Sequence, residues 1–355
     1  MSNFIKKIKA YLRLIRAHTV IATALTPSLG AFATFSILEG ELLPWNKIPI
    51  IITLFMVGVI VHVFGEILND YMDFEIDKSS IELKDKPLVS GDISKNGALV
   101  SLIIVFAFLI VIIAFSEFTV FSLILLAFAS STGILYQLIS KKWLHSAVFL
   151  GLYAFFIILF GAAYAGKYID LFSIPALVYI IAILGFFQLW TNTAILGHLK
   201  DLKNDAKCGV ETFPMRFGVK VKGDGKTPKL IIPMGFRVLV LIIQLINLII
   251  AFIPLILLNR FYPGEVNILL LSLGLILVSL IMMASQIKVM FFKIFERNKL
   301  MRLMAVREIG AYLLAIILLS PFMGWLLALI YIFLPFTWFV IINRIFTGKS
   351  MQAAI

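Results

Sequence analysis

The stretch IPIIITLFMVGVIVHVFGEILNDYMDFEID, residues 48–77, combines the two features from which we infer the fold and the chemistry. Residues 48–70 form an apolar run, and a helix needs about 20 such residues to cross the hydrocarbon core of a membrane. Inside a bilayer every backbone polar group needs an internal partner, so the run is predicted to be helical. Acidic residues gather where it ends. The stretch therefore predicts a membrane-spanning helix with an acidic end.

Similar apolar runs recur along the whole chain. The 355 residues are 61% hydrophobic and only 14% charged, whereas a soluble domain is about half apolar and about a quarter charged. The expected fold is all-α: a single domain over residues 1–355, built as a polytopic transmembrane bundle of nine or ten spans. The last two spans are separated only by residues around Pro321 and Gly324, so they could instead form one broken helix. We expect spans near residues 20–38, 48–70, 97–116, 118–138, 144–165, 172–199, 236–258, 265–287, 305–321 and 324–343.

Basic residues predict the orientation of this bundle. Of the 31 Lys and Arg residues, only Lys47, Lys167 and Arg260 fall in connections on one side of the membrane. Lys and Arg concentrate in cytoplasmic loops, so the other side, with both termini, is predicted to be cytoplasmic. The net charge of +12 is explained by these loops, and we expect membrane lipids rather than nucleic acid as partners. The protein is therefore expected to be integral to the cell membrane.

Three further segments carry expectations. The basic amphipathic start, MSNFIKKIKAYLRLIR (residues 1–16), is predicted to be an interfacial helix, with no cleavable signal peptide. The segment GVKVKGDGKTPK (residues 218–229) is predicted to be a flexible basic loop that faces anionic lipid. The single cysteine, Cys208, excludes an intramolecular disulfide and a cysteine-based zinc cluster.

The first acidic cluster lies on one face of its helix. Asp70, Asp73 and Asp77 are spaced i, i+3 and i+7, and Glu66 falls on the same face at i−4. Like charges in this arrangement repel one another, so a positive species is expected between them. Mg²⁺ prefers carboxylate oxygens and is commonly held by a few carboxylates together with substrate phosphates. The cluster therefore predicts a magnesium site.

The second acidic cluster is DLKND, residues 201–205. Asp201 and Asp205 are spaced i and i+4, follow an apolar span and lie on the same side of the membrane as the first cluster. Two such clusters that face one central cavity, open to the cytoplasmic side, would form a two-sided metal site suited to a diphosphate leaving group. The alternative for each cluster is a solvated helix end with ordinary surface charges, and for DLKND alone this alternative stays open.

These residues lead to a family resemblance. NDYMDFEID (69–77) resembles the N-D-x-x-D-x-x-x-D motif of the UbiA superfamily of intramembrane prenyltransferases. DLKND followed by AKCGVETFPMRFG (206–218) resembles the second motif of that family. KPLVSGDIS (86–94), LYQLISKK (135–142) and RAHT (16–19) are similar to three further segments of the family. The resemblance covers about residues 10–330, with the motifs in matching order.

The resemblance implies a Mg²⁺-dependent prenyltransferase. An isoprenyl group would pass from a prenyl diphosphate to a lipid or aromatic acceptor, and diphosphate would be released. The first motif (69–77) would act with the loop 78–96, and the second (201–205) with the loop 206–235. The carboxylates that would bind Mg²⁺ are Asp70, Asp73, Asp77, Asp201 and Asp205. Tyr136 would lie near the reacting carbon. Asn69, Lys86 and Lys141 would assist in binding the diphosphate.

Some features depart from the family pattern. Lys86 stands where the family has Arg, so a point charge replaces a bidentate fork. His198, before the second motif, is either a ligand or base or simply a packed residue. The acceptor implied by the resemblance is a quinone precursor or a geranylgeranylglyceryl phosphate ether lipid. The sequence predicts neither the prenyl chain length nor the oligomeric state.

Two other functions remain as alternatives. Intramembrane carboxylates also mark the ion paths of secondary transporters and channels. Transporters, however, usually place such groups near mid-membrane on broken helices, whereas these clusters lie at predicted helix ends. A lipid phosphotransferase that cleaves a CDP-alcohol would carry its aspartates in one continuous motif with Gly and Arg, which we do not find in this sequence.

Overall fold

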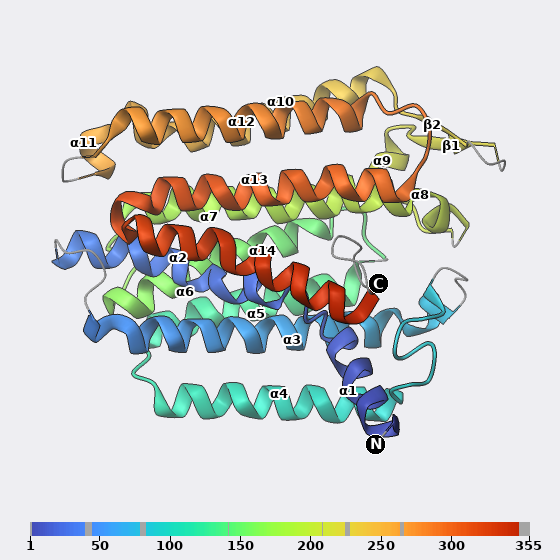
Figure 1. Ribbon diagram of the computed structural model, residues 1–355, viewed down its shortest axis with the longest axis horizontal. Helices are drawn as coiled ribbons and strands as arrows, with labels where there is room; N and C mark the ends of the chain where they lie inside the picture. The colour runs from blue at the N-terminus through green and yellow to red at the C-terminus, as the bar shows by residue number, and fades with distance from the viewer. Residues whose placement is uncertain are drawn as a thin grey trace.

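The computed structural model describes residues 2–39, 45–78, 83–140, 142–207, 209–223, 228–262 and 266–347. Most of the long helices run side by side along one direction in a single bundle (Figure 1). The predicted all-α fold is therefore confirmed. The helices are α1 (Ser2–Leu14), α2 (Val20–Glu39), η1 (Trp45–Lys47), α3 (Ile48–Lys78), α4 (Lys95–Phe115), α5 (Val120–Ile139), α6 (Ala147–Gly166), α7 (Ala176–Thr191), η3 (Asn192–Gly197), α8 (His198–Lys207), α9 (Phe213–Arg216), α10 (Met234–Ile256), α11 (Leu258–Phe261), α12 (Ile268–Met290), α13 (Arg297–Met323) and α14 (Trp325–Thr347).

The number of spans follows from helix length and composition. Within the described ranges, nine helices are long and apolar enough to cross a membrane, and α2 adds a shorter apolar stretch, Val20–Phe35. Helix α13 ends at Met323 and α14 begins at Trp325, with Gly324 between them at a φ of 72° that favours glycine. Helix α14 then turns back along the bundle (Figure 1). The last two predicted spans are therefore two helices and not one broken helix.

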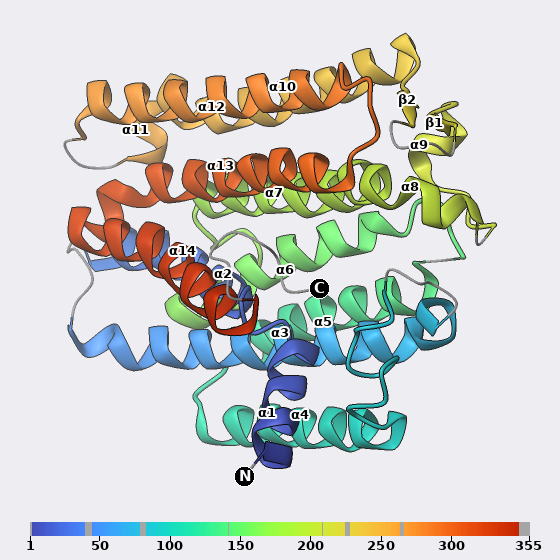
Figure 2. The same cartoon turned by 45° about the vertical axis from the view of Figure 1, so that its right-hand side comes forward.

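The helices form layers that both views show in the same order. Helices α10 and α12 form one edge of the bundle, α4 lies at the opposite edge, and α2, α6 and α7 lie between them (Figures 1 and 2). Helices α2 and α6 touch through glycine. A Cβ on Gly161 would lie 1.7 Å from the carbonyl oxygen of Pro27, and one on Gly30 would lie 2.1 Å from that of Ile158. Small residues allow this close backbone approach between membrane helices.

The helix that carries the second acidic cluster is continuous but irregular. Residues 176–207 form one long apolar-to-polar helix, and residues Asn192–Gly197 within it adopt π-helical turns. Such π-bulges occur frequently at functional sites. The predicted span 172–199 and the DLKND cluster therefore belong to a single helix that crosses the bundle and ends in acidic residues.

One sequence-based expectation about a connection was wrong in part. Residues 218–229 were predicted to form a flexible basic loop, but strands β1 (Lys220–Lys222) and β2 (Lys229–Ile231) pair as an antiparallel hairpin. Residues 224–227 of this segment lie outside the described residues. Lys220 pairs with Ile231 and Lys222 with Lys229. Leu230 is buried and its amide donates to the carbonyl oxygen of Lys293. The reason is that an apolar residue among the lysines can be buried against the segment before α13.

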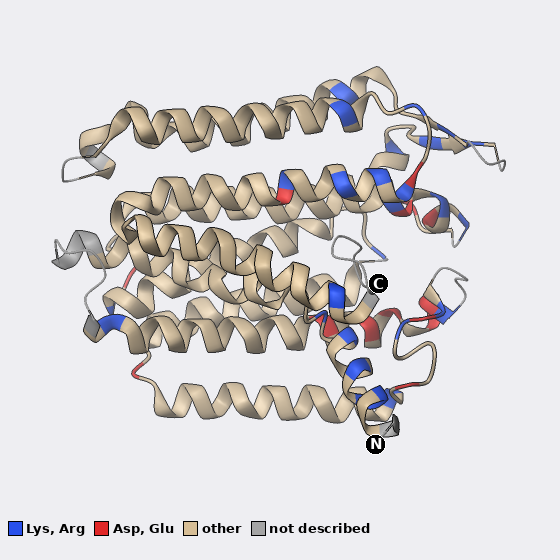
Figure 3. Cartoon of the chain, in the orientation of Figure 1, with Lys and Arg blue, Asp and Glu red and all other residues tan. Residues whose placement is uncertain are grey.

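Charged residues gather at one end of the bundle, where the acidic and basic segments of several helices meet (Figure 3). Helix α1 crosses this end at an angle to the long helices (Figure 1). Its helical conformation agrees with the sequence, whereas its predicted place at the membrane interface stays a prediction. The same holds for the cytoplasmic orientation of the charged end. The two acidic clusters lie at this end, so the fold gives them a shared location.

Candidate active site

The first acidic cluster lies on the last turns of α3, which stays helical through the whole motif. Asp70 and Asp77 are buried, while Asp73 is half-buried. Because the helix is uninterrupted, residues spaced by seven lie on the same face, two turns apart. The sequence prediction of a shared carboxylate face is therefore consistent with the backbone of α3.

Lys86 contacts two carboxylates of this face at once. Its Nζ atom lies 2.9 Å from Asp70 Oδ1 and 2.6 Å from Asp77 Oδ2. Burial opposes the charge of Lys86, but the carboxylates of Asp70 and Asp77 outweigh it, so the pKa of this lysine is raised. The geometry shows that two carboxylates of the first motif can converge on a single positive centre.

Apolar packing holds the loop that carries Lys86. Leu88 and Ile93 of this loop are buried in a cluster with Leu14 of α1 and Ile67 of α3. Two polar contacts also join the loop to α1: Lys6 pairs with Asp92 at 2.9 Å, and Arg13 donates to the backbone carbonyl of Asp85. Helix α1 therefore fixes the loop against α3 and so positions the Lys86 ammonium.

Arg16 is a site residue that the sequence reasoning did not select. Its guanidinium lies 2.9 Å from Glu66 Oε2, donates to Asn69 Oδ1 at 3.1 Å and lies 3.7 Å from Asp70 Oδ1. The carboxylate of Glu66 raises the pKa of Arg16 most, and that of Asp70 raises it further, although burial acts in the opposite direction. Its backbone has a φ of 44°, a conformation that is strained for a residue other than glycine. The sequence feature that could have indicated Arg16 is the RAHT segment, residues 16–19, but its resemblance to the family predicted only the start of the first span.

The second cluster places its two aspartates in different surroundings. The Asp201 side chain is 35% exposed and accepts from Arg297 Nε of α13 at 3.2 Å. The Asp205 side chain is only 4% exposed, and its Oδ2 atom lies 3.6 Å from His198 Nδ1. Because His198 faces an acid of the motif, it belongs to the neighbourhood of the site. The ion pair with Arg297 was not predicted because the two residues are 96 positions apart.

Tyr136 connects the two clusters. Its hydroxyl interacts electrostatically with Asp73 and Glu66 of α3 and also with Asp205 of α8. The next residue, Gln137, accepts a hydrogen bond of 2.8 Å from Asn69 Nδ2, so α5 is also tied to the first motif. Lys141, which the family resemblance implicated in phosphate binding, lies outside the described residues. The structure thus brings Tyr136, Asn69 and acids of both motifs to one region.

The carboxylates of the two clusters are the candidate ligands for Mg²⁺. The described part of the chain contains no group of three or more His, Cys, Asp or Glu side chains already gathered as a metal site. The acids nevertheless supply the hard oxygen donors that Mg²⁺ prefers. Asp70 and Asp77 already share one cation, the Lys86 ammonium. Asp70 and Asp77 therefore fit a metal ion that would replace the Lys86 ammonium between them.

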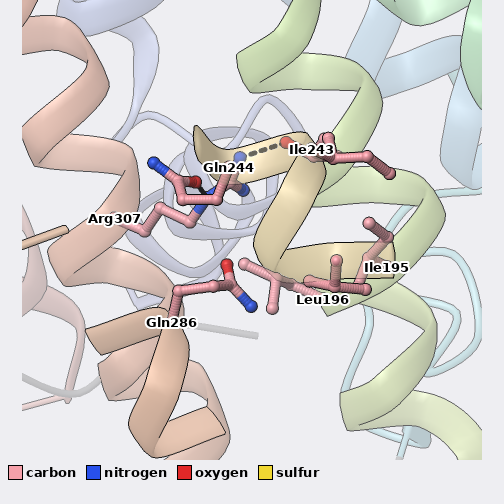
Figure 4. A pocket seen from close by; sticks show the side chains of 8 residues that line it. Ile195, Leu196, Ile243, Gln244, Gln286 and Arg307 are labelled. Carbon is pink, nitrogen blue, oxygen red and sulfur yellow. Dashed lines mark hydrogen bonds between the residues drawn. The ribbon is translucent and has the colours of Figure 1, made fainter. Parts of the chain in front are cut away.

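A second polar group lies within the spans, away from the acidic end. Arg307 of α13 is buried, and its guanidinium donates to Gln244 Oε1 at 2.8 Å (Figure 4). It also donates to Asn192 Oδ1 at 2.6 Å. Asn192 Nδ2 in turn donates to Glu308 Oε1 at 2.9 Å. Sequence reasoning counted Arg307 with the cytoplasmic charges, but α13 begins at Arg297, so Arg307 lies about 15 Å further along the helix. Hydrogen bonds from α7, η3 and α10 make this burial tolerable.

Comparisons with known proteins agree with the fold and the motifs. The sequence model of the UbiA prenyltransferase family matches residues 24–287. A curated digeranylgeranylglyceryl phosphate synthase from Sulfurisphaera tokodaii is 30% identical over 223 residues, which cover 60% of this chain and 71% of the relative.

Two solved structures resemble the fold. One, from work on digeranylgeranylglyceryl phosphate synthase in membranes, has a TM-score of 0.62 at 20% identity and covers 89% of this chain and 99% of its own. The other, a UbiA homolog from Archaeoglobus fulgidus bound to GPP and Mg²⁺, has a TM-score of 0.56 at 18% identity. That match covers 86% of this chain and 99% of the homolog.

Proposed function

Because the chain belongs to the UbiA prenyltransferase family and is an integral membrane prenyltransferase, we propose that it uses Mg²⁺ to transfer an isoprenyl group from a prenyl diphosphate. The observation that carries this proposal is the convergence of Asp70 and Asp77 on one cation. The location of Tyr136 within electrostatic range of Asp73 and Asp205, one acid from each motif, supports it further. The A. fulgidus homolog is bound to GPP and Mg²⁺, which supports the choice of donor and metal.

The acceptor we propose is the free hydroxyl of a geranylgeranylglyceryl phosphate lipid. The support is that the S. tokodaii relative is a digeranylgeranylglyceryl phosphate synthase. This proposal favours the ether-lipid acceptor over the quinone precursor, the other acceptor that the family resemblance implied. The secondary transporter or channel finds no support, because the matched family and relative are both enzymes of group transfer.

Each candidate residue has a proposed role in this reaction. Mg²⁺, when bound, would neutralise the charge that develops on the departing diphosphate. Lys86, released from Asp70 and Asp77 by the metal, would donate to the phosphate oxygens, and Lys141 is proposed to share this role. Asn69 is hydrogen-bonded to both Arg16 and Gln137 and would hold the end of α3 in position. The Tyr136 ring would lie against the reacting carbon and stabilise its positive charge. Five aspartates would hold Mg²⁺: Asp70, Asp73, Asp77, Asp201 and Asp205.

Prenyl transfer in liposomes tests this function. The purified protein is supplied with radiolabelled geranylgeranyl diphosphate, Mg²⁺ and either geranylgeranylglyceryl phosphate or an aromatic quinone precursor. We expect a labelled diether lipid with the first acceptor, and its loss when a chelator removes Mg²⁺. A labelled product with the aromatic acceptor alone would replace the proposed acceptor. If no allylic diphosphate of any chain length released diphosphate, the proposed donor chemistry would be wrong.

A further inference from the structure

Transfer to a hydroxyl leaves a proton that some group must accept, and none of the residues proposed above has this task. The bond from C1 of the prenyl group to the diphosphate breaks and gives an allylic cation, and the acceptor oxygen then forms its bond to C1. The diphosphate leaves with the bonding electron pair, and the new ether oxygen carries the hydroxyl proton as an oxonium. A carboxylate near C1 that is not engaged with the metal is suited to accept this proton as the ether forms.

Glu66 has the position that this base needs. It lies on α3 four residues before Asp70, about 6 Å of helix rise toward the interior of the span and on the same face. The reacting carbon of a diphosphate bound at Asp70 would lie in this direction, because the prenyl chain must continue into the apolar part of the bundle. The Glu66 side chain is 21% exposed, so a substrate atom can reach it.

The surroundings of Glu66 hold its carboxylate in place. Arg16 Nη1 lies 2.9 Å from Glu66 Oε2, and the strained turn of Arg16 is fixed by the hydrogen bond from Thr19 Oγ1 to its carbonyl oxygen. The same guanidinium also reaches Asn69 and Asp70. The Glu66 carboxylate is therefore turned toward Arg16, on the side of α3 that carries the first motif.

The ion pair with Arg16 is compatible with a role as base. The acceptor hydroxyl becomes far more acidic as its oxygen attacks the allylic cation, so an ion-paired carboxylate can take the proton while the new C–O bond forms. Arg16 would hold the Glu66 carboxylate in its orientation before the reaction. After the proton is transferred, neutral Glu66 still offers a carbonyl oxygen to the guanidinium.

Other interior groups fit this task less well. His62 is buried, and its Nε2 atom contacts the carbonyl oxygen of Ile15 at 3.1 Å. His198 faces Asp205 of the second motif. Glu308 lies 11 residues beyond Arg297, the partner of Asp201, which corresponds to roughly 16 Å along α13. Its Oε1 atom already accepts a hydrogen bond of 2.9 Å from Asn192 Nδ2, within the polar group around Arg307.

We propose that Glu66 is a catalytic residue, the base that accepts the proton of the acceptor hydroxyl during prenyl transfer. This inference rests on the proposed function. It adds a residue outside both aspartate motifs, and it assigns Arg16 as the positioning residue that holds Glu66.

The test separates ionisation of the donor from transfer to the acceptor. Geranylgeranyl diphosphate is prepared with an isotopic label in the oxygen that bridges C1 and phosphorus. Ionisation followed by return moves this label into non-bridging positions, even when no ether forms. The full-length variants Glu66→Gln, Glu66→Asp and Asp70→Asn are compared with the wild type in liposomes that contain geranylgeranylglyceryl phosphate. Glu308→Gln is the matched control, because it removes another carboxylate from a span.

For Glu66→Gln we expect ether formation to fall by about 10²-fold or more, the usual effect of losing a general base. Label scrambling should continue at a rate comparable with the wild type. Asp70→Asn should lose both signals, Glu66→Asp should recover part of the ether formation, and Glu308→Gln should keep both. Glutamine can still accept from Arg16, so the fold of the Glu66→Gln variant should persist.

Two results would overturn the assignment. One is ether formation by Glu66→Gln close to that of the wild type. The other is a parallel loss of scrambling and ether formation, which would make Glu66 a structural or donor-binding residue. Failure of the proposed function gives a different pattern, because the wild type itself would then form no ether, and it would also show no scrambling if the donor chemistry were wrong.

Discussion

At the scale of single residues, the carboxylates were predictable and their cationic partners were not. Asp70, Asp73 and Asp77 follow from spacing along one helix, which is a local property of the sequence. Arg16 and Lys86 contact Asp70 across 54 and 16 positions respectively, and such contacts depend on how α1 and the loop after α3 pack. The family resemblance suggested Lys86, but only the packing explains why it lies between two acids.

The Lys86 contact leads to a stability prediction. Lys86→Met removes the ammonium that Asp70 and Asp77 share while it keeps the length of the side chain. Breaking such a largely buried ion pair typically costs about 3–5 kcal/mol, so the metal-free variant should unfold at a lower temperature. Mg²⁺ should restore more of the Tm in the variant than it adds to the wild type. Thermal unfolding in detergent with and without Mg²⁺ measures both effects, and equal Mg²⁺ effects on the two proteins would contradict the shared-cation interpretation.

The aspartates lead to a prediction about turnover. Asp70→Asn and Asp201→Asn should each lower kcat by about 10²-fold or more, because each removes a charge needed at the developing negative charge of the diphosphate. Asp170→Asn is the matched control, since Asp170 caps a turn through Ser173 at the opposite end of the bundle. Release of diphosphate from geranylgeranyl diphosphate is the measurement. Near-normal rates for both site variants would remove them from the metal site.

At the scale of elements, apolar runs predicted the long helices well because the membrane demands both their length and their composition. Irregular features were missed. The π-helical turns Asn192–Gly197 have no strong local signal, and they are stabilised by partners such as Arg307, which donates to Asn192 at 2.6 Å. The hairpin β1–β2 was missed because its lysines made the segment read as a polar loop. The burial of Leu230, which indicates the hairpin, depends on a distant segment.

The contact between α2 and α6 leads to a prediction about folding. In Gly161→Ala the new Cβ would lie 1.7 Å from the Pro27 carbonyl oxygen, so the two backbones must separate. Overpacking of this kind costs about 1–3 kcal/mol or more, and the Tm should fall clearly. In Gly235→Ala nothing lies within 4 Å of the added atom, so this variant should unfold like the wild type. Thermal unfolding of the two purified variants compares them directly, and equal Tm values would show that α2 and α6 do not touch there.

At the scale of the whole molecule, the asymmetry of charge was the most reliable information in the sequence. The positions of Lys and Arg divided the connections into two sides, and in the structure most of the charged residues described lie at one end (Figure 3). The shared location of both acidic clusters at this end was also predicted. Their connection through Tyr136 could not be, because it requires α3, α5 and α8 to be packed around one region.

This asymmetry leads to a prediction about topology. In a Cys208→Ser background, Phe172→Cys places a thiol on an exposed turn between α6 and α7, at the end opposite the charged one. Lys222→Cys places a thiol on β1, at the charged end. A membrane-impermeant maleimide should label the first variant in intact cells, and the second only after the membrane is permeabilised. The reverse pattern would place the acidic clusters on the outer surface.

The hydrogen bond between the two ends of the chain has a consequence for biosynthesis. Trp338 Nε1 of α14 donates to the carbonyl oxygen of Ala17 at 2.6 Å, across 321 positions, and Ala17 directly follows Arg16. Chains fold progressively as they leave the ribosome, so the turn that presents Arg16 to Glu66 waits, without this support, until α14 has been translated. The turn at Arg16 therefore gains this hydrogen bond only after α14 has been synthesised, so the geometry between Arg16 and Glu66 depends on a helix translated more than 300 residues later.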